Sequence, residues 1–130
     1  MLRTSNAYSS FAAKDLAAEK RFFTDTLGLK VEEPFDDQLL QLDLSDDKHV
    51  MIYAKPDFTP ATFTVLNFPV PDVDAAVEEL TRSGVEMARF EGFDQDEKGI
   101  ARPGADGGPT IAWFRDPAGN ILAVHDEAGM

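Results

Sequence analysis

Few side chains in this chain of 130 residues suit catalysis or metal binding, and their positions limit the chemistry they can perform. The chain has no cysteine, which excludes a thiolate nucleophile, a thiolate metal site and a disulfide framework. The two histidines, His49 and His125, form no sequence-evident arrangement with a nucleophile and an orienting carboxylate, so we predict no catalytic triad. His49 borders a predicted hairpin turn. We expect His125, at the end of the last predicted strand, to face solvent, although strand alternation also allows it to reach a cavity as a base or a lone metal ligand.

The segment from residue 90 to residue 109 is the longest irregular stretch that the sequence predicts. Loops beyond about 12–15 residues are uncommon in compact domains and are often functional. This segment has Lys98 and Arg102, two cations in a strongly acidic chain. They either bind an anionic or carbonyl-bearing ligand or are solvated at a flexible hairpin tip. The sequence favours neither alternative, so the role of residues 94–109 stays open.

The composition excludes several classes of partner. The chain has 12 Lys and Arg against 24 Asp and Glu, a formal net charge of −12. Nucleic acids and anionic membrane surfaces would repel such a chain, because both bind proteins mainly through Lys and Arg. The acidic residues occur in short dispersed clusters, which is typical of a solvated surface. No apolar run approaches the roughly 20 residues that span a bilayer, and the first residues lack a signal-peptide pattern, so we expect a cytoplasmic protein.

The elements that position these side chains occur twice. Asp15 is placed to cap a helix that ends at Gly28, and Asp72 is placed to cap a second helix that ends at Gly84. Each helix follows a strand-like run and precedes a short extended stretch, which is residues 85–87 in the second half. A hairpin completes each half, so each half is predicted to fold as β-α-β-β-β. The predicted fold class is therefore α+β with an internal duplication.

The two halves form the predicted domain organisation. Each half is too small to bury its sheet alone, so we predict one domain over residues 1–130 with a shared core. Module one covers about residues 6–54, a linker with two prolines covers 55–61, and module two covers about 62–126. The sequence leaves open whether the modules pair within one chain or swap between two chains.

Two motifs resemble the vicinal oxygen chelate superfamily, which includes glyoxalases, bleomycin-resistance proteins and extradiol dioxygenases. The first motif spans the first helix and its final glycine, and the second is a turn near the C-terminus. The matching segments are Lys14-Asp15-Leu16, Phe22-Phe23, Leu27-Gly28-Leu29 and Phe114-Arg115-Asp116-Pro117-Ala118-Gly119-Asn120. Together with the duplication, the resemblance covers almost the whole chain. It implies two βαβββ modules that form paired incomplete β-barrels around a cavity, and a homodimer.

Many members of that superfamily hold a divalent metal at four positions on the first and last strands of each module. The resemblance places these positions at Tyr8, Ile52, Val65 and Ala123. Met51 and Tyr53 are alternatives to Ile52 if the register of the first module differs. Divalent metals prefer carboxylate, imidazole or amide ligands, and a neutral tyrosine is a poor ligand. We therefore predict no metal site and no other cofactor.

The same resemblance places the remaining candidate residues around the cavity. A mostly apolar pocket with a few polar groups is typical of a small-molecule site. Asn67 either orients a ligand there or makes structural hydrogen bonds. The predicted cavity residues are Tyr8, Tyr53, Phe63, Val65, Asn67, Lys98, Arg102, Trp113, Ala123 and His125.

These residues predict a protein that binds a small organic molecule in the cavity without a catalytic metal, as sequestering or drug-resistance members of the superfamily do. One alternative is an enzyme, a glyoxalase-like lyase, an isomerase or a dioxygenase, with rearranged site residues. Such an enzyme would be metal-dependent or would use loop carboxylates such as Asp94, Asp96 or Glu97. Another alternative is a dimeric interaction module whose cavity is vestigial. The sequence does not identify the ligand.

Overall fold

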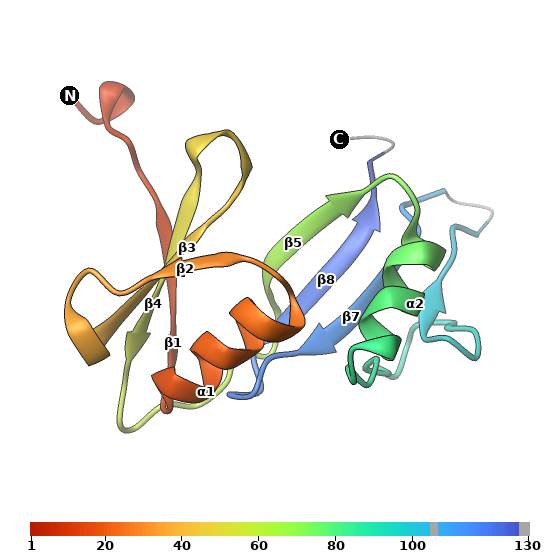
Figure 1. Cartoon of the computed structure of the whole chain (residues 1–130). Helices are drawn as coiled ribbons and strands as arrows, with labels where there is room; N and C mark the ends of the chain where they lie inside the picture. Colours follow the sequence, from red (N-terminus) through yellow and green to blue (C-terminus); the bar gives the residue numbers. More distant parts are fainter. Residues whose placement is uncertain (105–106, 128–130) are drawn as a thin grey trace. The chain divides into compact units, whose positions relative to one another are not determined.

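A computed structural model describes residues 1–104 and 107–127 of the chain (Figure 1). The chain divides after Pro60 into two units, and the division lies within the predicted linker. Each unit contains a β-α-β-β-β module with a four-stranded mixed sheet, which confirms the predicted fold class and the duplication. Within the described ranges, every helix is too short or too polar to cross a membrane.

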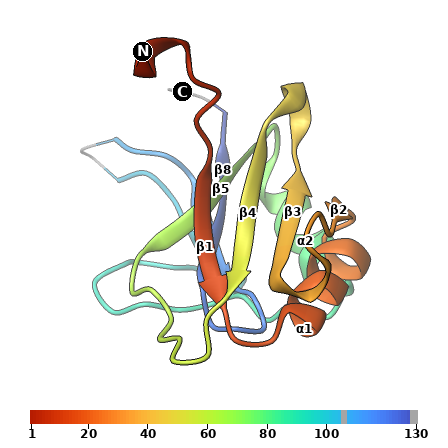
Figure 2. The same cartoon turned by 90° about the vertical axis from the view of Figure 1, so that its left-hand side faces the viewer.

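The first module consists of β1 (Ser9–Ala13), α1 (Leu16–Arg21), β2 (Lys30–Glu32), β3 (Leu39–Asp43) and β4 (His49–Ala54). Its sheet has the order β1-β4-β3-β2, in which β1 is parallel to β4 and the other pairs are antiparallel (Figure 2). A π-helical turn at Phe22–Thr26 extends α1, as the longer predicted helix requires. Short 3₁₀ turns occur at Leu2–Thr4, Asp36–Gln38 and Ser45–Asp47.

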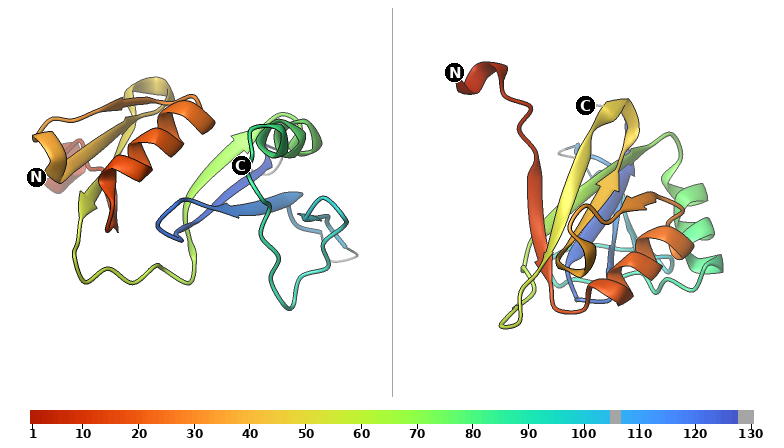
Figure 3. Two further views of the ribbon diagram at one scale, coloured as in Figure 1. Left: turned by 60° about the horizontal axis from the view of Figure 1, so that its bottom comes forward. Right: turned by 60° about the vertical axis from the view of Figure 1, so that its left-hand side comes forward.

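The second module consists of β5 (Thr64–Val70), α2 (Val73–Arg82), β6 (Ile100–Ala101), β7 (Ile111–Arg115) and β8 (Ile121–Asp126). Its sheet repeats the topology of the first, with the order β5-β8-β7-β6. The pair β5–β8 is parallel, and the pairs β7–β8 and β6–β7 are antiparallel. Figure 3 shows that each helix runs along one face of the sheet of its own module.

The helix boundaries form as the sequence predicts. The carboxylate of Asp15 accepts a hydrogen bond from the backbone N–H of Ala18 at 3.1 Å, and that of Asp72 accepts one from Ala75 at 3.1 Å. Each bond satisfies an N–H group that would otherwise have no partner in the first helical turn. The predicted stop at Gly28 has a φ of 72°, in the left-handed region that favours glycine.

The outer edge of the second sheet differs from the prediction. Residues 85–87 do not form the expected strand, and the edge strand is β6, which lies inside the segment predicted to be an irregular loop. The edge of β7 is shared between two segments, because Ala88 donates a backbone hydrogen bond to the carbonyl of Trp113 at 2.8 Å and β6 pairs with the residues before Trp113. The predicted loop therefore contains regular structure that positions it along the sheet.

The turn between β7 and β8 is the predicted Asp-Pro-Ala-Gly-Asn turn. One carboxylate oxygen of Asp116 accepts the backbone N–H of Asn120 at 2.8 Å, and the other accepts its side-chain amide at 3.1 Å. Both residues are buried. Gly119 adopts a φ of 93°, which a side chain would disfavour. The turn thereby fixes the register of the hairpin that carries the candidate site.

Candidate functional site

The two faces of the second sheet have different surroundings. Trp113 clusters with Ala88, Ala101, Ile121 and Ala123, and no residue of α2 belongs to this cluster in the described part of the chain. Successive side chains of a strand point to opposite faces, so the buried neighbour Phe114 lies on the face that packs against α2. We call the face around Trp113 the aromatic face. Its members are Ile111, Trp113 and Arg115 of β7, Ile121, Ala123 and His125 of β8, and Phe90 and Phe93 of the loop between α2 and β6.

Three aromatic rings form the centre of this face. Phe90 lies edge-on to Trp113, with ring centroids 5.6 Å apart and planes at 88°. Phe93 lies against the same indole at 4.7 Å and 55°. Trp113 is only 7% exposed, whereas Phe93 is 55% exposed. Such aromatic contacts are worth about 0.5–1.5 kcal/mol beyond the area they bury. The indole is therefore covered on one side by a ring that is itself half in solvent.

A cation lies beside these rings. The guanidinium carbon of Arg115 is 5.1 Å from the ring centroid of Phe90, within the range of a cation–π contact. Arg115 pairs in register with Ile121, a member of the Trp113 cluster, so its side chain starts from the aromatic face. Sequence reasoning missed this residue. Its position two residues after Trp113 on one strand was the available signal, because strand side chains repeat every second residue.

The loop that carries Phe90 and Phe93 is held by one glutamine. The side-chain oxygen of Gln95 accepts the N–H of Phe90 at 2.9 Å, and its amide nitrogen donates to the carbonyls of Ala88 at 2.9 Å and Gly99 at 2.8 Å. Gln95 therefore closes the segment from residue 88 to residue 99 upon itself next to Trp113. No local motif in the sequence singles out this glutamine, because its three partners are backbone groups.

Two predicted polar residues of the second module lie on the aromatic side of the sheet. Asn67 pairs in register with Ala123, so the two side chains share a face, and Asn67 is exposed there. His125 is on the same face as Ala123, as alternation predicts, but it is only 8% exposed. The expectation of a solvent-facing His125 is therefore wrong. β8 continues to Asp126 and pairs on both sides at this point, and the His125 Nδ1 lies 2.8 Å from the Asp126 carbonyl oxygen.

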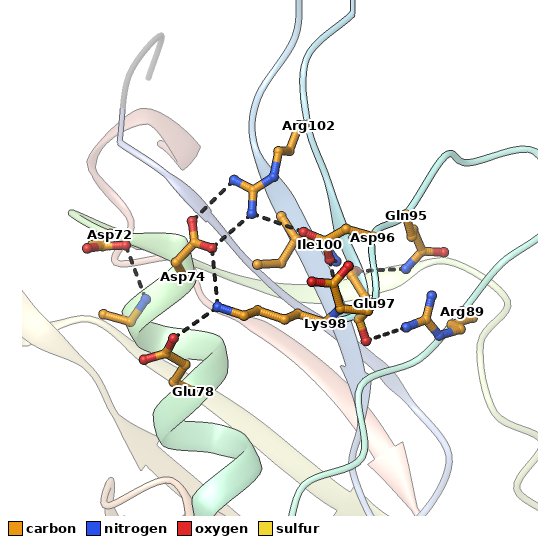
Figure 4. Close-up of polar contacts among 12 residues, drawn as sticks. Asp72, Asp74, Glu78, Arg89, Gln95, Asp96, Glu97, Lys98, Ile100 and Arg102 are labelled. Atoms are coloured by element: carbon orange, nitrogen blue, oxygen red, sulfur yellow. Dashed lines mark hydrogen bonds and ion pairs between the residues drawn. The ribbon is translucent and has the colours of Figure 1, made fainter.

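The two loop cations are placed on the helix side of the sheet instead. The guanidinium of Arg102 contacts both carboxylate oxygens of Asp74 on α2 at 2.8 and 3.2 Å, and it contacts Asp96 at 3.0 Å (Figure 4). Lys98 contacts Glu78 of α2 at 2.9 Å. The hydrogen bond from Arg102 lowers the pKa of Asp74. These contacts join the loop to α2, so the structure does not bring either cation together with Trp113.

Asp96 also shapes the loop from within. Its carboxylate accepts the backbone N–H groups of Lys98 and Ile100, both at 2.9 Å. The hydrogen bond from Ile100 is the largest cause that lowers the pKa of Asp96, and the bond from Arg102 adds to it. These bonds keep Asp96 ionised and fix the turn that leads into β6. Asp96, one of the three loop carboxylates that the sequence offers for acid–base work, thus has a structural role in the loop.

The predicted residues outside this sheet are largely exposed. Tyr8, Tyr53 and Phe63 are exposed aromatic side chains. Tyr8 lies 5.2 Å from the ring of His49 and lines a hollow of about 630 Å³ at the start of β1. Val65, by contrast, belongs to β5 of the second sheet and lies where the β5–β8 pairing is interrupted, between the paired residues Thr64 and Leu66.

The face of the first sheet that points away from its core carries a polar cluster. The side-chain amide of Gln41 donates to Glu32 at 3.1 Å and to Asp43 at 2.8 Å. The hydrogen bond with Asp43 raises the pKa of Glu32, whereas the hydrogen bonds from Gln41 and Glu32 lower the pKa of Asp43. Two neighbouring carboxyl groups therefore differ in their tendency to hold a proton. Sequence reasoning did not connect these three residues, which come from adjacent strands.

The positions expected to hold a metal do not fit one. Ser10 on β1 and Asn67 on β5 are equivalent positions of the two modules. Ser10 pairs with Met51 and Asn67 pairs with Ala123, so Met51 and not Ile52 is the counterpart of Ala123. Ile52 is fully buried on the α1 side of its sheet. Neither a thioether nor a methyl group suits a hard divalent cation. Across residues 1–104 and 107–127, no three His, Asp or Glu side chains are grouped as metal ligands would be.

Comparison with known proteins connects this fold to one family. The sequence model of the Glyoxalase/Bleomycin resistance protein/Dioxygenase superfamily matches residues 7–124. A comparison with curated proteins gives no significant match. Among solved structures, lactoylglutathione lyase from Agrobacterium tumefaciens is similar with a TM-score of 0.67 and 19% identity, over 97% of this chain and 98% of that chain.

Two further structures have the same fold. TnmS3, an antibiotic binding protein from Streptomyces sp. CB03234, has a TM-score of 0.64 and 20% identity, over 95% of this chain and 97% of that chain. The fosfomycin resistance protein FosX from Listeria monocytogenes, whose structure holds Mn(II) and 1S,2S-dihydroxypropylphosphonic acid, has a TM-score of 0.66 and 16% identity, over 94% and 89%. At these identities the likeness extends to the fold alone.

Proposed function

Because the chain belongs to the Glyoxalase/Bleomycin resistance protein/Dioxygenase superfamily, we propose that it binds a small organic molecule on the aromatic face, without a catalytic metal. One observation carries the proposal: the indole of Trp113 lies among alanines and is covered by the half-exposed ring of Phe93. Small-molecule sites are mostly apolar, with a few polar groups that orient the ligand. The antibiotic binding protein TnmS3 gives a precedent for binding on this fold.

The geometry favours a planar ring as the bound group. Phe93 and Phe90 each make a separate ring contact with Trp113, and Phe93 is the half-exposed one. A flat ligand can therefore displace Phe93 from the indole and leave Phe90 in place. Three residues of the Trp113 cluster, Ala88, Ala101 and Ala123, have short side chains. In this module, the positions at which the resemblance expects metal ligands carry Val65 and Ala123, whose side chains suit apolar contact. The proposed function is therefore sequestration of an aromatic compound.

The test uses the single tryptophan of the sequence as a reporter. Titration with menadione, a flat neutral quinone, is expected to quench the emission of Trp113 saturably and to raise the melting temperature by mass action. Trp113→Leu removes the stacking surface and should abolish the thermal shift. Phe114→Leu is the matched control, because it lies next on the same strand and faces α2. It should lower stability but keep the shift. Loss of the shift in both variants, or no quenching of the wild type, would contradict the proposal.

A specific observation favours a second candidate, acid–base catalysis on the first sheet. Gln41 holds Glu32 and Asp43 together, and their environments move the two pKa values in opposite directions. Such a pair can divide the roles of acid and base. Turnover of the methylglyoxal–glutathione adduct, lost in Asp43→Asn and kept in the exposed control Asp46→Asn, would support this candidate. Binding of menadione with no turnover would leave sequestration as the function.

A further inference from the structure

We propose that the ligand of the aromatic face is a planar aromatic acid, and that Arg115 binds its anionic group. The inference rests on the proposed function and adds the class of ligand. Its ring would lie on Trp113 in the place of Phe93, and its carboxylate would be paired by the guanidinium next to Phe90.

The placement of Arg115 brings a cation within reach of the stacking surface. Arg115 and Trp113 are alternate residues of β7 and therefore start from the same face. The guanidinium lies 5.1 Å from the centroid of Phe90, and that ring lies 5.6 Å from Trp113. One aromatic ring thus separates the charge from the indole. A compound of two fused rings on Trp113 would therefore extend its carboxylate toward Arg115.

The guanidinium of Arg115 contacts a ring and no carboxylate within residues 1–104 and 107–127. In the part of the chain that the structure describes, no carboxylate forms an ion pair with it, although the chain has 24 acidic residues. Its neighbour Asp116 is turned into the hairpin, where both carboxylate oxygens bind Asn120. The cations Lys98 and Arg102 of the same module are both paired with carboxylates on α2. Arg115 is therefore the cation that the aromatic face presents to a ligand.

The chemistry of the guanidinium selects the ligand. Its planar fork of N–H groups matches a carboxylate in a bidentate pair, and charge-assisted bonds of this kind are about twice as strong as neutral ones. The net charge of −12 opposes anions elsewhere on the protein, so anion binding depends on this one local cation. A neutral ring compound of the same shape keeps the stacking contact with Trp113 and loses only the pair with Arg115.

Isothermal titration calorimetry with 2-naphthoate and its neutral isostere 2-naphthamide tests the inference. The wild type is expected to bind 2-naphthoate about 10-fold more tightly, which corresponds to about 1.4 kcal/mol. Arg115→Gln should reduce the ratio of the two affinities to about 1 and leave the affinity for 2-naphthamide unchanged. Arg82→Gln is the matched control, because it removes an exposed arginine from α2, and it should keep the 10-fold ratio.

The outcomes separate this inference from the proposed function. Equal affinities in the wild type, or an unchanged ratio in Arg115→Gln, would overturn the role of Arg115 while binding of 2-naphthamide still supports an aromatic site. Failure of the wild type to bind either compound, with unchanged Trp113 emission, would overturn both. If Arg115→Gln loses all binding, Arg115→Lys decides: a restored preference for 2-naphthoate supports the inference, and restored binding without the preference overturns it.

Discussion

Removal of the Gln95 side chain is expected to release the loop that covers Trp113. Gln95→Ala eliminates three hydrogen bonds, with the N–H of Phe90 and the carbonyls of Ala88 and Gly99, at 2.8–2.9 Å. A hydrogen bond of this kind contributes about 1 kcal/mol net, and unsatisfied buried partners cost more. Because the loop is only part-buried, water will replace some of these bonds. We expect a loss of about 2 kcal/mol in the free energy of unfolding.

Urea unfolding followed by circular dichroism measures this loss, and the emission of Trp113 reports on the loop. Phe90 and Phe93 are attached to the segment that Gln95 closes, so its release exposes the indole and shifts the emission of the folded protein to longer wavelength. Gln38→Ala is the matched control. The side chain of Gln38 is exposed and makes no hydrogen bond within the described ranges, so its loss should change stability by less than about 0.5 kcal/mol.

Two results together would contradict the role of Gln95 as the anchor of the loop. If Gln95→Ala and Gln38→Ala lose the same small amount of stability, the three bonds of Gln95 are replaced by water without cost. If the emission of Trp113 is also unchanged, the rings of Phe90 and Phe93 hold their places without this anchor. The contacts of Phe90 and Phe93 with Trp113 would then be sufficient to hold the loop in place.

The remaining predictions concern the ion pairs between the loop and α2. Hydrogen bonds from Arg102 and from the N–H of Ile100 lower the pKa values of Asp74 and Asp96, respectively. Their contribution to stability is therefore complete above the unfolded-state pKa near 4 and is lost as the pH falls through the lower folded-state values, which urea unfolding between pH 7 and pH 2 will show. Arg102→Gln should lower the melting temperature, but by less than Gln95→Ala, because its pairs are half-exposed. Lys55→Gln breaks the exposed ion pair between Lys55 and Asp57, which are only two residues apart in sequence. It should lower the melting temperature by a smaller amount still. An effect of Arg102→Gln no larger than that of Lys55→Gln would show that the loop does not depend on α2.

The parts of the fold that local chemistry decides could be predicted from the sequence. The capping aspartates Asp15 and Asp72 act on groups three residues away, and Gly28 acts through its own backbone, so each signal is complete within a few positions. The Asp-Pro-Ala-Gly-Asn turn is local in the same sense. These signals, repeated in the same order, were enough to predict both β-α-β-β-β modules.

The parts that depend on distant partners could not be predicted. Ile100 and Ala101 form the edge strand because β7 offers free backbone groups there, and nothing within two residues marks them as a strand. The burial of His125 follows from pairing on both sides of β8, which alternation alone does not report. The anchor Gln95 and the cation Arg115 matter through contacts that sequence spacing does not contain. Tertiary pairing thus decides the residues that complete the candidate site.

The strand registers show which residues of the two sheets occupy equivalent positions, and these residues differ in chemistry. The hairpins have loops of the same length, residues 44–48 and 116–120, so the pair Gln41–Met51 occupies the place of Trp113–Ala123. By the same match Asp43 corresponds to Arg115. One module therefore presents an amide with carboxylates where the other presents an indole with a guanidinium. An aromatic acid is attracted by the second face and repelled by the first, because the charge at the equivalent position is reversed. The helix-covered faces of both modules are apolar and carry the common fold, whereas the opposite faces differ in charge and in aromatic content.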